Sequence, residues 1–227
     1  MAARAPRAQK QTEMARTRSP NFEDIQLGIL KKAARLFATH GYERTSIGDL
    51  VRACDLSRGA IYHYFESKEA ILFAMMDSLV RGLLETLTEA AAEEGAPVER
   101  LERIIAAFVE YNARSPDEQV ILLHDIGALS RSEQKQIHAI EKQVVELVAE
   151  AIMAADTRGV VTPRTRKVYT MMLFGMINYT YTWYDAKGPV KPRELAEMAT
   201  EVFLGGLWPG ARRLAPLAAL RAKTAQR

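Results

Sequence analysis

The sequence contains a single cysteine, Cys54, so the chain cannot form an internal disulfide. A lone thiol is typical of proteins kept in a reducing cytoplasm. The sequence also lacks any run near the roughly 18 consecutive apolar residues that a membrane-spanning helix needs. No apolar run follows the basic residues at the N-terminus, as it would in a secretory signal. We therefore expect a cytoplasmic protein with no membrane partner.

Catalytic and metal-binding motifs are equally scarce. The sequence has no glycine-rich phosphate loop, no HExxH or GxSxG motif and no cluster of metal ligands. The four histidines fall in separate helical contexts: His40, His63, His124 and His138. We expect a protein that is not an enzyme and that needs no metal or cofactor. An all-helical enzyme of an unfamiliar type is the alternative.

Charge is unevenly distributed along the chain. Residues 1–20 contain five basic residues and one acidic residue, and residues 211–227 contain five basic residues and no acidic one. Because the formal net charge of the whole chain is +3, the segment between these tails is acidic overall. Basic arms can strengthen attraction to DNA phosphates, or they can simply be solvated, and both interpretations remain open. We expect both tails to be disordered.

Apolar residues recur at helical spacing from residue 22 onward. Ile25, Ile29, Ala33 and Phe37 fall on one helix face, and Gly41 ends that helix. No segment shows the alternation of a strand, so the sequence predicts an all-α fold with about nine helices. The expected ranges are 22–40, 46–53, 57–65, 67–93, 98–114, 117–127, 131–157, 163–186 and 191–207.

Two of these helices are short and separated by a tight turn, which is the arrangement of a helix-turn-helix unit. Thr45 or Ser46 can cap the first helix and Ser57 the second, and Asp49 stands three residues after Ser46, as in a capping box. In such a unit the second helix lies in the major groove of DNA. Ile61 and Phe65, four residues apart, can point into the core, which leaves the rest of that helix to face outward.

Several motifs at fixed spacing carry a resemblance to a known family. They are Leu36-Phe37, Gly41-Tyr42, Arg44-Thr45-Ser46, Ser57-Arg58-Gly59-Ala60-Ile61-Tyr62-His63-Tyr64-Phe65 and Ser67-Lys68-Glu69-Ala70-Ile71-Leu72. From about residue 29 to residue 72 the sequence resembles the N-terminal domain of the TetR family of one-component repressors. The resemblance implies a dimer that binds double-stranded operator DNA and is released by a small molecule.

The resemblance also implies roles for individual residues. Thr45 would cap the second helix and contact phosphate, and Tyr62 and Lys68 would contact phosphates. Arg58 would approach base edges, where it can pair bidentately with guanine. Packing of the Tyr62 and Tyr64 rings against the first helix is the alternative for those two residues. The full predicted DNA-contacting set is Arg44, Thr45, Ser46, Ser57, Arg58, Gly59, Ala60, Tyr62, His63, Tyr64 and Lys68.

The chain is thus expected to have four parts. These are a basic arm (1–21), the helix-turn-helix domain (22–68), an effector-binding and dimerisation domain (69–210) and a basic tail (211–227). In the TetR family the last two helices of each subunit usually form a four-helix interface with the partner. The residues expected there are Met172, Gly175, Tyr179, Leu195, Met198 and Phe203, although an ordinary intrachain core is the alternative.

The segment 176–189, which is rich in tyrosine and contains Trp183, resembles a subset of the family that responds to acyl-coenzyme A thioesters. An acyl chain needs an apolar tunnel, and a nucleotide needs an aromatic plate and cations. Trp183 could form the plate, with Arg131, Lys135 or Arg164 beside it, or it could simply pack between helices. The predicted effector-binding set is Phe108, Tyr111, Leu122, Arg131, Met171, Phe174, Asn178, Tyr181 and Trp183.

Two further alternatives concern regulation. A cationic drug as effector would need buried carboxylates among aromatic residues, and Glu110 beside Tyr111, or Asp125, could supply them. An activator instead of a repressor is also compatible with the sequence, because the motifs indicate DNA binding and not its effect on transcription.

Overall fold

The computed structural model describes residues 20–207, so the predicted basic tails lie almost entirely outside the described residues. Within this range the chain forms nine α-helices and no strand, which confirms the all-α prediction. The helices, with two 3₁₀ segments, are α1 (Pro20–His40), α2 (Ile47–Cys54), α3 (Arg58–Tyr64), α4 (Lys68–Ala92), α5 (Pro97–Arg114), α6 (Pro116–Asp125), η1 (Ile126–Ala128), α7 (Arg131–Ala155), α8 (Arg166–Asn178), η2 (Tyr179–Thr182) and α9 (Pro192–Leu207).

Local side-chain hydrogen bonds explain where the short helices begin. Ser46 and Asp49 form a complete capping box at α2, and the Ser57 hydroxyl accepts a hydrogen bond from the Ala60 N–H at 3.1 Å. Ser67 caps α4 in the same way, through the Ala70 N–H at 3.1 Å. Between α2 and α3, Asp55 adopts a left-handed conformation with φ 54°, which allows the tight turn.

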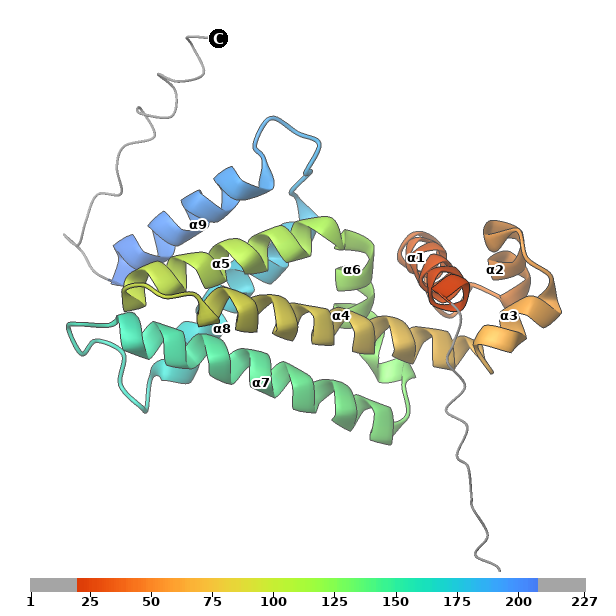
Figure 1. The fold of residues 1–227 in the computed structure, drawn as a ribbon, viewed down its shortest axis with the longest axis horizontal. Helices are drawn as coiled ribbons and strands as arrows, with labels where there is room; N and C mark the ends of the chain where they lie inside the picture. Colours follow the sequence, from red (N-terminus) through yellow and green to blue (C-terminus); the bar gives the residue numbers. More distant parts are fainter. Residues whose placement is uncertain (1–19, 208–227) are drawn as a thin grey trace, which may run out of the picture.

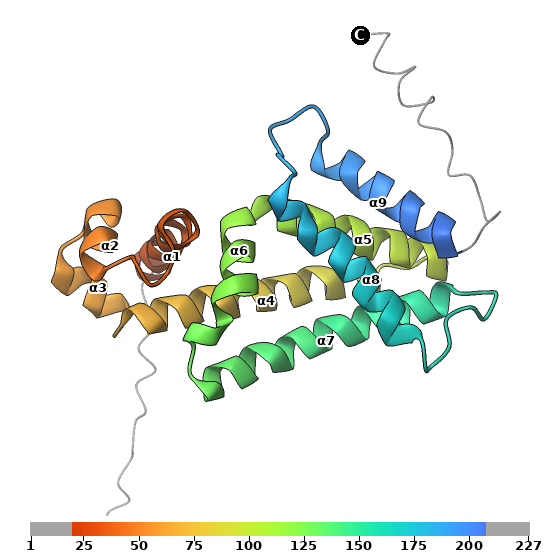
Figure 2. The same cartoon turned by 180° about the vertical axis from the view of Figure 1, so that it is seen from behind.

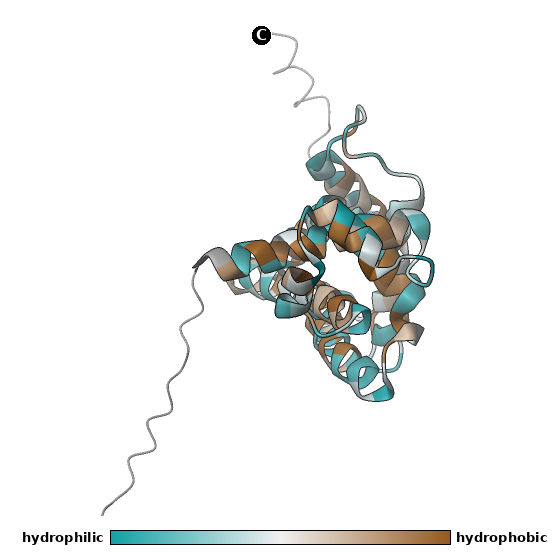
Figure 3. Ribbon diagram, turned by 90° about the vertical axis from the view of Figure 1, so that its right-hand side faces the viewer, coloured by the Kyte–Doolittle hydropathy of each residue, from teal (hydrophilic) through white to brown (hydrophobic). Residues whose placement is uncertain are grey.

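The helices fall into a small unit and a larger one, as Figures 1 and 2 show. Helices α1–α3 form the small unit at one end, and α4 runs from it along the length of the larger one. In the larger unit α4 packs against α5 and α7, α9 packs on α5, and α8 packs on α7 and α5, while α6 stands between this bundle and α1. Apolar helix faces turn toward one another and polar faces turn outward (Figure 3).

One apolar core holds the small unit to the larger one. It contains Ile29 and Phe37 of α1 and Ile61 of α3, and it continues through the start of α4 to Ile121 of α6 and Ile137 of α7. A second core fills the bundle of α4, α5, α7, α8 and α9. Helices α6 and α1 pack against each other within this core. A displacement of α6 would therefore change the position of α1.

Gly82 of α4 gives a test of the packing between α4 and α5. The Tyr111 hydroxyl donates a hydrogen bond to the Leu79 carbonyl at 2.9 Å, and a Cβ added at Gly82 would overlap that hydroxyl oxygen. Gly82→Ala gains about 1 kcal/mol of helix propensity. Displacement of the tyrosine costs about 1–3 kcal/mol, so we expect a net loss of about 1 kcal/mol in the free energy of unfolding.

The control for this prediction is the Tyr111→Phe background, in which the overlapping oxygen is gone. There, Gly82→Ala should be neutral or stabilising in a urea titration, so the two substitutions should couple by about 1 kcal/mol or more. Simple additivity of the two effects would contradict the packing argument.

Candidate functional site

Helices α2 and α3 have the geometry of a DNA-reading unit. Leu50, Ile61 and Phe65 are buried beneath them, as the spacing of Ile61 and Phe65 predicts. The opposite side of α3 faces solvent, with Tyr62 44% exposed and the Arg58 guanidinium 6.0 Å from the Tyr62 ring centroid. Of the predicted DNA-contacting residues, those exposed are Arg44, Ser46, Ser57, Arg58, Gly59, Tyr62 and His63, while Ala60, Tyr64 and Lys68 are half-buried.

Thr45 does not have the capping role that the resemblance implies. Ser46, and not Thr45, caps α2. The Thr45 side chain is only 3% exposed, and its hydroxyl donates to the Gly41 carbonyl at 2.9 Å. This internal bond braces the turn after α1, where Gly41 has φ 86°. The prediction that Thr45 caps α2 is therefore wrong, while its contact with phosphate stays a prediction.

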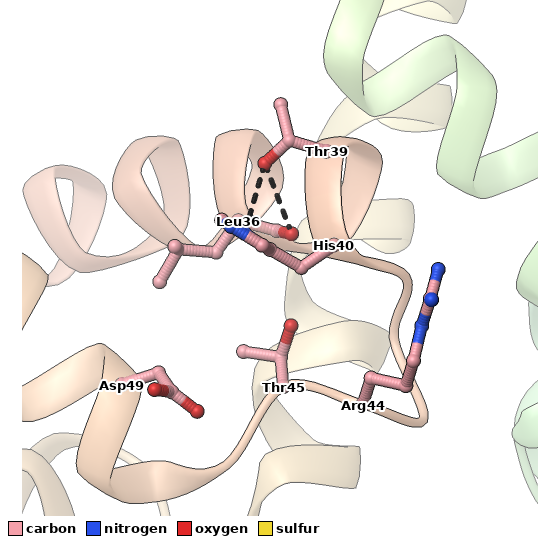
Figure 4. Close-up of a pocket in the computed structure, with 6 residues that line it drawn as sticks. All are labelled: Leu36, Thr39, His40, Arg44, Thr45 and Asp49. Carbon is pink, nitrogen blue, oxygen red and sulfur yellow. Dashed lines mark hydrogen bonds between the residues drawn. The ribbon is translucent and has the colours of Figure 1, made fainter.

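Thr45 forms the floor of a small hollow of about 280 Å³ between α1 and α2 (Figure 4). Arg44 extends beside it from the connecting loop, and Thr39 and His40 lie above it at the end of α1. Asp49 also lines the hollow, but its carboxylate is already engaged by the Ser46 N–H at 2.8 Å and by Arg52. The hollow thus offers the Arg44 cation at its rim, and the acidic charge within it is neutralised locally.

Tyr64 supports the packing alternative. Its ring lies 4.6 Å from the ring of Phe22 in α1, and the His63 ring lies 5.8 Å from the same phenylalanine. Tyr64 therefore joins α3 to α1, whereas Tyr62 remains on the open face.

Lys68 fastens the start of α4 to the turn that precedes α2. Its ammonium group donates to the Tyr42 carbonyl at 3.0 Å and lies 4.2 Å from the centroid of the Tyr42 ring. The Tyr42 hydroxyl in turn donates to the Glu69 carboxylate at 3.2 Å. Hydrogen bonds from its own backbone N–H and from Ser67 lower the pKa of Glu69, so this carboxylate stays ionised beside the lysine.

We expect Lys68→Met to lower the free energy of unfolding by about 1–2 kcal/mol, because it removes a charged hydrogen bond and a cation–π contact at a half-buried site. Chemical denaturation measures this loss. Lys135→Met, at an exposed position on α7, should change stability by less than about 0.5 kcal/mol. Equal effects of the two substitutions would mean that Lys68 has no structural role.

A cavity of about 540 Å³, here called the apolar chamber, lies between α4, α5, α6, α7 and α8. Phe108 and Phe174 meet edge to face in its wall, with ring centroids 4.9 Å apart. Six of the nine predicted effector-binding residues line it: Phe108, Leu122, Met171, Phe174, Asn178 and Tyr181. Gly175 and Tyr179, predicted at the dimer interface, line it as well.

A second cavity of about 430 Å³, here called the polar vestibule, adjoins the chamber. The two share Gln119, Asn178 and Tyr181. Arg114 and Lys187 line the vestibule, together with Asp185. These two cations were not identified from the sequence, because they are far apart in the chain and belong to no motif.

Three predicted effector-binding residues lie elsewhere. Tyr111 turns toward α4 and lines a separate cavity of about 140 Å³ beside Lys31 and Glu118, where burial raises the pKa of the Glu118 carboxyl. Arg131 is exposed at the start of α7. Trp183 is 61% exposed and lines neither the chamber nor the vestibule. In the isolated subunit, the cation and aromatic plate expected from Arg131 and Trp183 are therefore not assembled.

Two of the residues predicted at the dimer interface lie largely inside their own subunit. Leu195 and Phe203 are 9% and 8% exposed and belong to the core of their own subunit, because α9 packs that face against α5. Met172 and Tyr179, in contrast, are 61% and 65% exposed. Gly175 is also exposed, and Met198 is half-buried.

The carboxylates considered for a cationic effector do not line the chamber. Neither Glu110 nor Asp125 is among the residues of its wall. Glu141 does line it, and its carboxylate accepts a hydrogen bond from His138 Nδ1 at 2.7 Å. Tyr181 closes the wall near α6, where its hydroxyl lies 2.8 Å from His124 Nε2.

Residues 20–207 contain no helix long and apolar enough to cross a membrane. The same residues contain no group of three or more side chains suited to holding a metal ion.

A helix-turn-helix joined to a helical bundle with a ligand-sized cavity is the architecture of ligand-responsive transcriptional regulators. Residues 29–75 match the bacterial regulatory proteins of the tetR family, and residues 94–207 match the tetracyclin repressor-like C-terminal domain. The chain belongs to the TetR family of transcriptional regulators, which are not enzymes.

Individual relatives agree with this assignment. A TetR-family regulator from Bordetella parapertussis is 38% identical, with 80% of this chain and 95% of that chain covered and a TM-score of 0.74. AibR, solved in complex with isovaleryl coenzyme A and operator DNA, is 28% identical, with 78% and 97% covered and a TM-score of 0.68. The transcriptional repressor KstR2 of Mycobacterium tuberculosis is 25% identical over 190 residues, which cover 79% of this chain and 90% of KstR2.

Proposed function

We propose that this protein is a dimeric transcriptional repressor that leaves its operator when the apolar chamber binds an acyl-coenzyme A thioester. The observation that carries the effector class is the pairing of the chamber with a vestibule that contains Arg114 and Lys187. A long apolar group fits the first cavity and a phosphate-bearing group fits the second. The complex of AibR with isovaleryl coenzyme A supports the same class.

The size of the chamber favours a longer acyl group than isovaleryl. At about 30 Å³ for each water-sized group, 540 Å³ holds on the order of 18 such groups. A short branched acyl group would leave much of this space unfilled, whereas a medium or long fatty acyl chain fills it.

On the DNA, α3 lies in the major groove with Arg58, Gly59 and Ala60 toward the base edges. Arg44, Tyr62 and the remaining donors of Lys68 contact phosphates on either side. Ser46, Ser57, His63 and Tyr64 lie around these contacts, while Thr45 supports the turn from within.

Helix α6 connects the effector to the DNA. It supplies Gln119, Leu122 and Leu123 to the chamber wall and packs on α1 with its other side. An acyl chain that fills the chamber moves α6, and α1 carries the displacement to α3. The two recognition helices of a dimer must stand about 34–36 Å apart to reach successive turns of one DNA groove. A small change in that spacing releases the operator.

A gel-shift titration on DNA flanking the protein's own gene, at near-physiological salt, tests this proposal. We expect a specific complex that dodecanoyl-coenzyme A dissolves and a quaternary ammonium dye does not. Arg58→Ala should weaken specific binding by about 1–3 kcal/mol, whereas Arg131→Ala should leave it unchanged. Release by the dye alone would overturn the effector class, and equal binding to random DNA would overturn the repressor itself.

A further inference from the structure

Three side-chain amides from three helices form a continuous relay at the boundary of the chamber and the vestibule. The Gln119 amide of α6 donates to the Asn112 carbonyl oxygen of α5 at 2.8 Å. The Asn112 amide donates to the Asn178 carbonyl oxygen of α8 at 3.0 Å. Asn112 and Gln119 are only 6% and 4% exposed. The relay thus joins three amide side chains from three helices, two of them buried.

Buried amides are costly unless their polar groups are paired. Each amide has one carbonyl and two N–H donors. Two hydrogen bonds among three amides therefore leave hydrogen-bonding groups unpaired at the two ends of the relay. These are the Gln119 carbonyl oxygen and the Asn178 N–H groups, for which the described residues show no protein partner. Reversing all three amides together exchanges the ends, so the relay presents one donor and one acceptor either way.

Both ends of the relay border the space that a ligand would occupy. Gln119 and Asn178 line the chamber and also the vestibule, whereas the middle residue, Asn112, lines the vestibule alone. The relay therefore stands where an apolar chain would leave the chamber and a charged head would enter the vestibule toward Arg114 and Lys187.

We infer that this amide relay binds the polar segment of the effector between the acyl chain and the nucleotide, which contains the thioester carbonyl and, beyond the sulphur, an amide N–H. The relay thereby selects acyl thioesters over ligands that have only an apolar chain and an anionic group. The Asn178 end donates to the thioester carbonyl oxygen. The Gln119 end accepts from the amide N–H of the arm beyond the sulphur. Asn112 touches no ligand in the chamber but orients both ends, which makes it a positioning residue. This inference rests on the proposed function and adds the residues that recognise the thioester segment of the ligand.

Paired ligands test the inference on the purified full-length protein by isothermal titration calorimetry. Dodecanoyl-coenzyme A contains the thioester carbonyl, and S-dodecyl-coenzyme A has a methylene in its place. We expect the wild-type protein to bind the thioester about tenfold more tightly, because the thioether leaves a relay donor without a partner. Asn178→Leu should reduce this preference to within about twofold.

Thr180→Val is the matched control, because Thr180 lines the vestibule and its hydroxyl is bonded to the Ile177 carbonyl outside the relay. It should retain the full preference for the thioester. Asn112→Leu should lose the preference as well, and this second variant tests the relay if Asn178→Leu fails to fold. Equal binding of both ligands by the wild-type protein, with the operator still released by the thioester, would overturn the relay inference alone. Binding of neither ligand would overturn the proposed effector class together with it.

Discussion

Replacing Met172 by glutamate is expected to convert the protein from a dimer to a monomer and to abolish operator binding. Val168, Met172 and Gly175 of α8 and Tyr179, the first residue of η2, recur at spacings of four, three and four, and all four are exposed. Their spacing places them on one face of this segment, at the surface of the subunit. Large apolar side chains gathered on an exposed helix face favour an interface there.

The expected effect is large because a two-fold axis would bring both introduced carboxylates into the same interface. Burying an unpaired charge costs several kcal/mol, so we expect the dimer dissociation constant to rise by at least about 100-fold. The fold of the subunit should survive, since Met172 is 61% exposed in it. Sedimentation velocity measures the assembly, and a gel shift measures the loss of DNA binding.

Gln136→Glu is the control, because it adds the same charge to an exposed position of another helix, α7. It should leave both the dimer and operator binding intact. A Met172→Glu protein that still sediments as a dimer would exclude this face of α8 from the interface.

Local interactions explain why the DNA-reading half was the more predictable part. The boundaries of α2, α3 and α4 depend on Ser46, Ser57 and Ser67, each of which bonds a backbone N–H three residues away. Such bonds are visible in the sequence as capping residues at fixed spacing. The capping role predicted for Thr45 is wrong because the choice between the adjacent hydroxyls of Thr45 and Ser46 depends on the turn at Gly41.

The effector half depends on contacts that no local pattern contains. Helix α8 ends at Asn178 and continues as the 3₁₀ segment η2, whereas the sequence favoured one helix to residue 186. A 3₁₀ turn has three residues instead of 3.6, which rotates the following side chains. Tyr181 consequently reaches the cavity while Trp183 turns to solvent.

Periodicity identifies an apolar helix face but not the surface it packs against. Leu195 and Phe203 share such a face on α9, and the sequence allowed either the partner subunit or the subunit's own core. In the structure α9 packs on α5, which buries both residues in the core of their own subunit. The same limit explains Tyr111, which shares α5 with Phe108 but points at α4 through its bond to Leu79.

Truncation of Phe108 should have the largest effect on stability, about 3–5 kcal/mol of unfolding free energy for Phe108→Ala. Phe108 is 1% exposed and packs edge to face with Phe174, so the substitution removes buried apolar area and an aromatic pair together. Urea denaturation measures the loss. Met171→Ala is the matched control, because Met171 also lines the chamber but is 40% exposed, and its truncation should cost about 1 kcal/mol or less.

The void left by Phe108→Ala opens into the apolar chamber, and this connects stability to ligand size. A longer acyl chain can enter the void and recover part of the lost contact, so the variant should shift its preference toward longer acyl-coenzyme A thioesters than the wild-type protein binds best. A ligand that binds only the folded state stabilises it in proportion to its affinity, so the same urea titrations with added thioesters of increasing length report the shift. A loss below about 1 kcal/mol, with an unchanged length preference, would mean that Phe108 is not part of the chamber wall in solution.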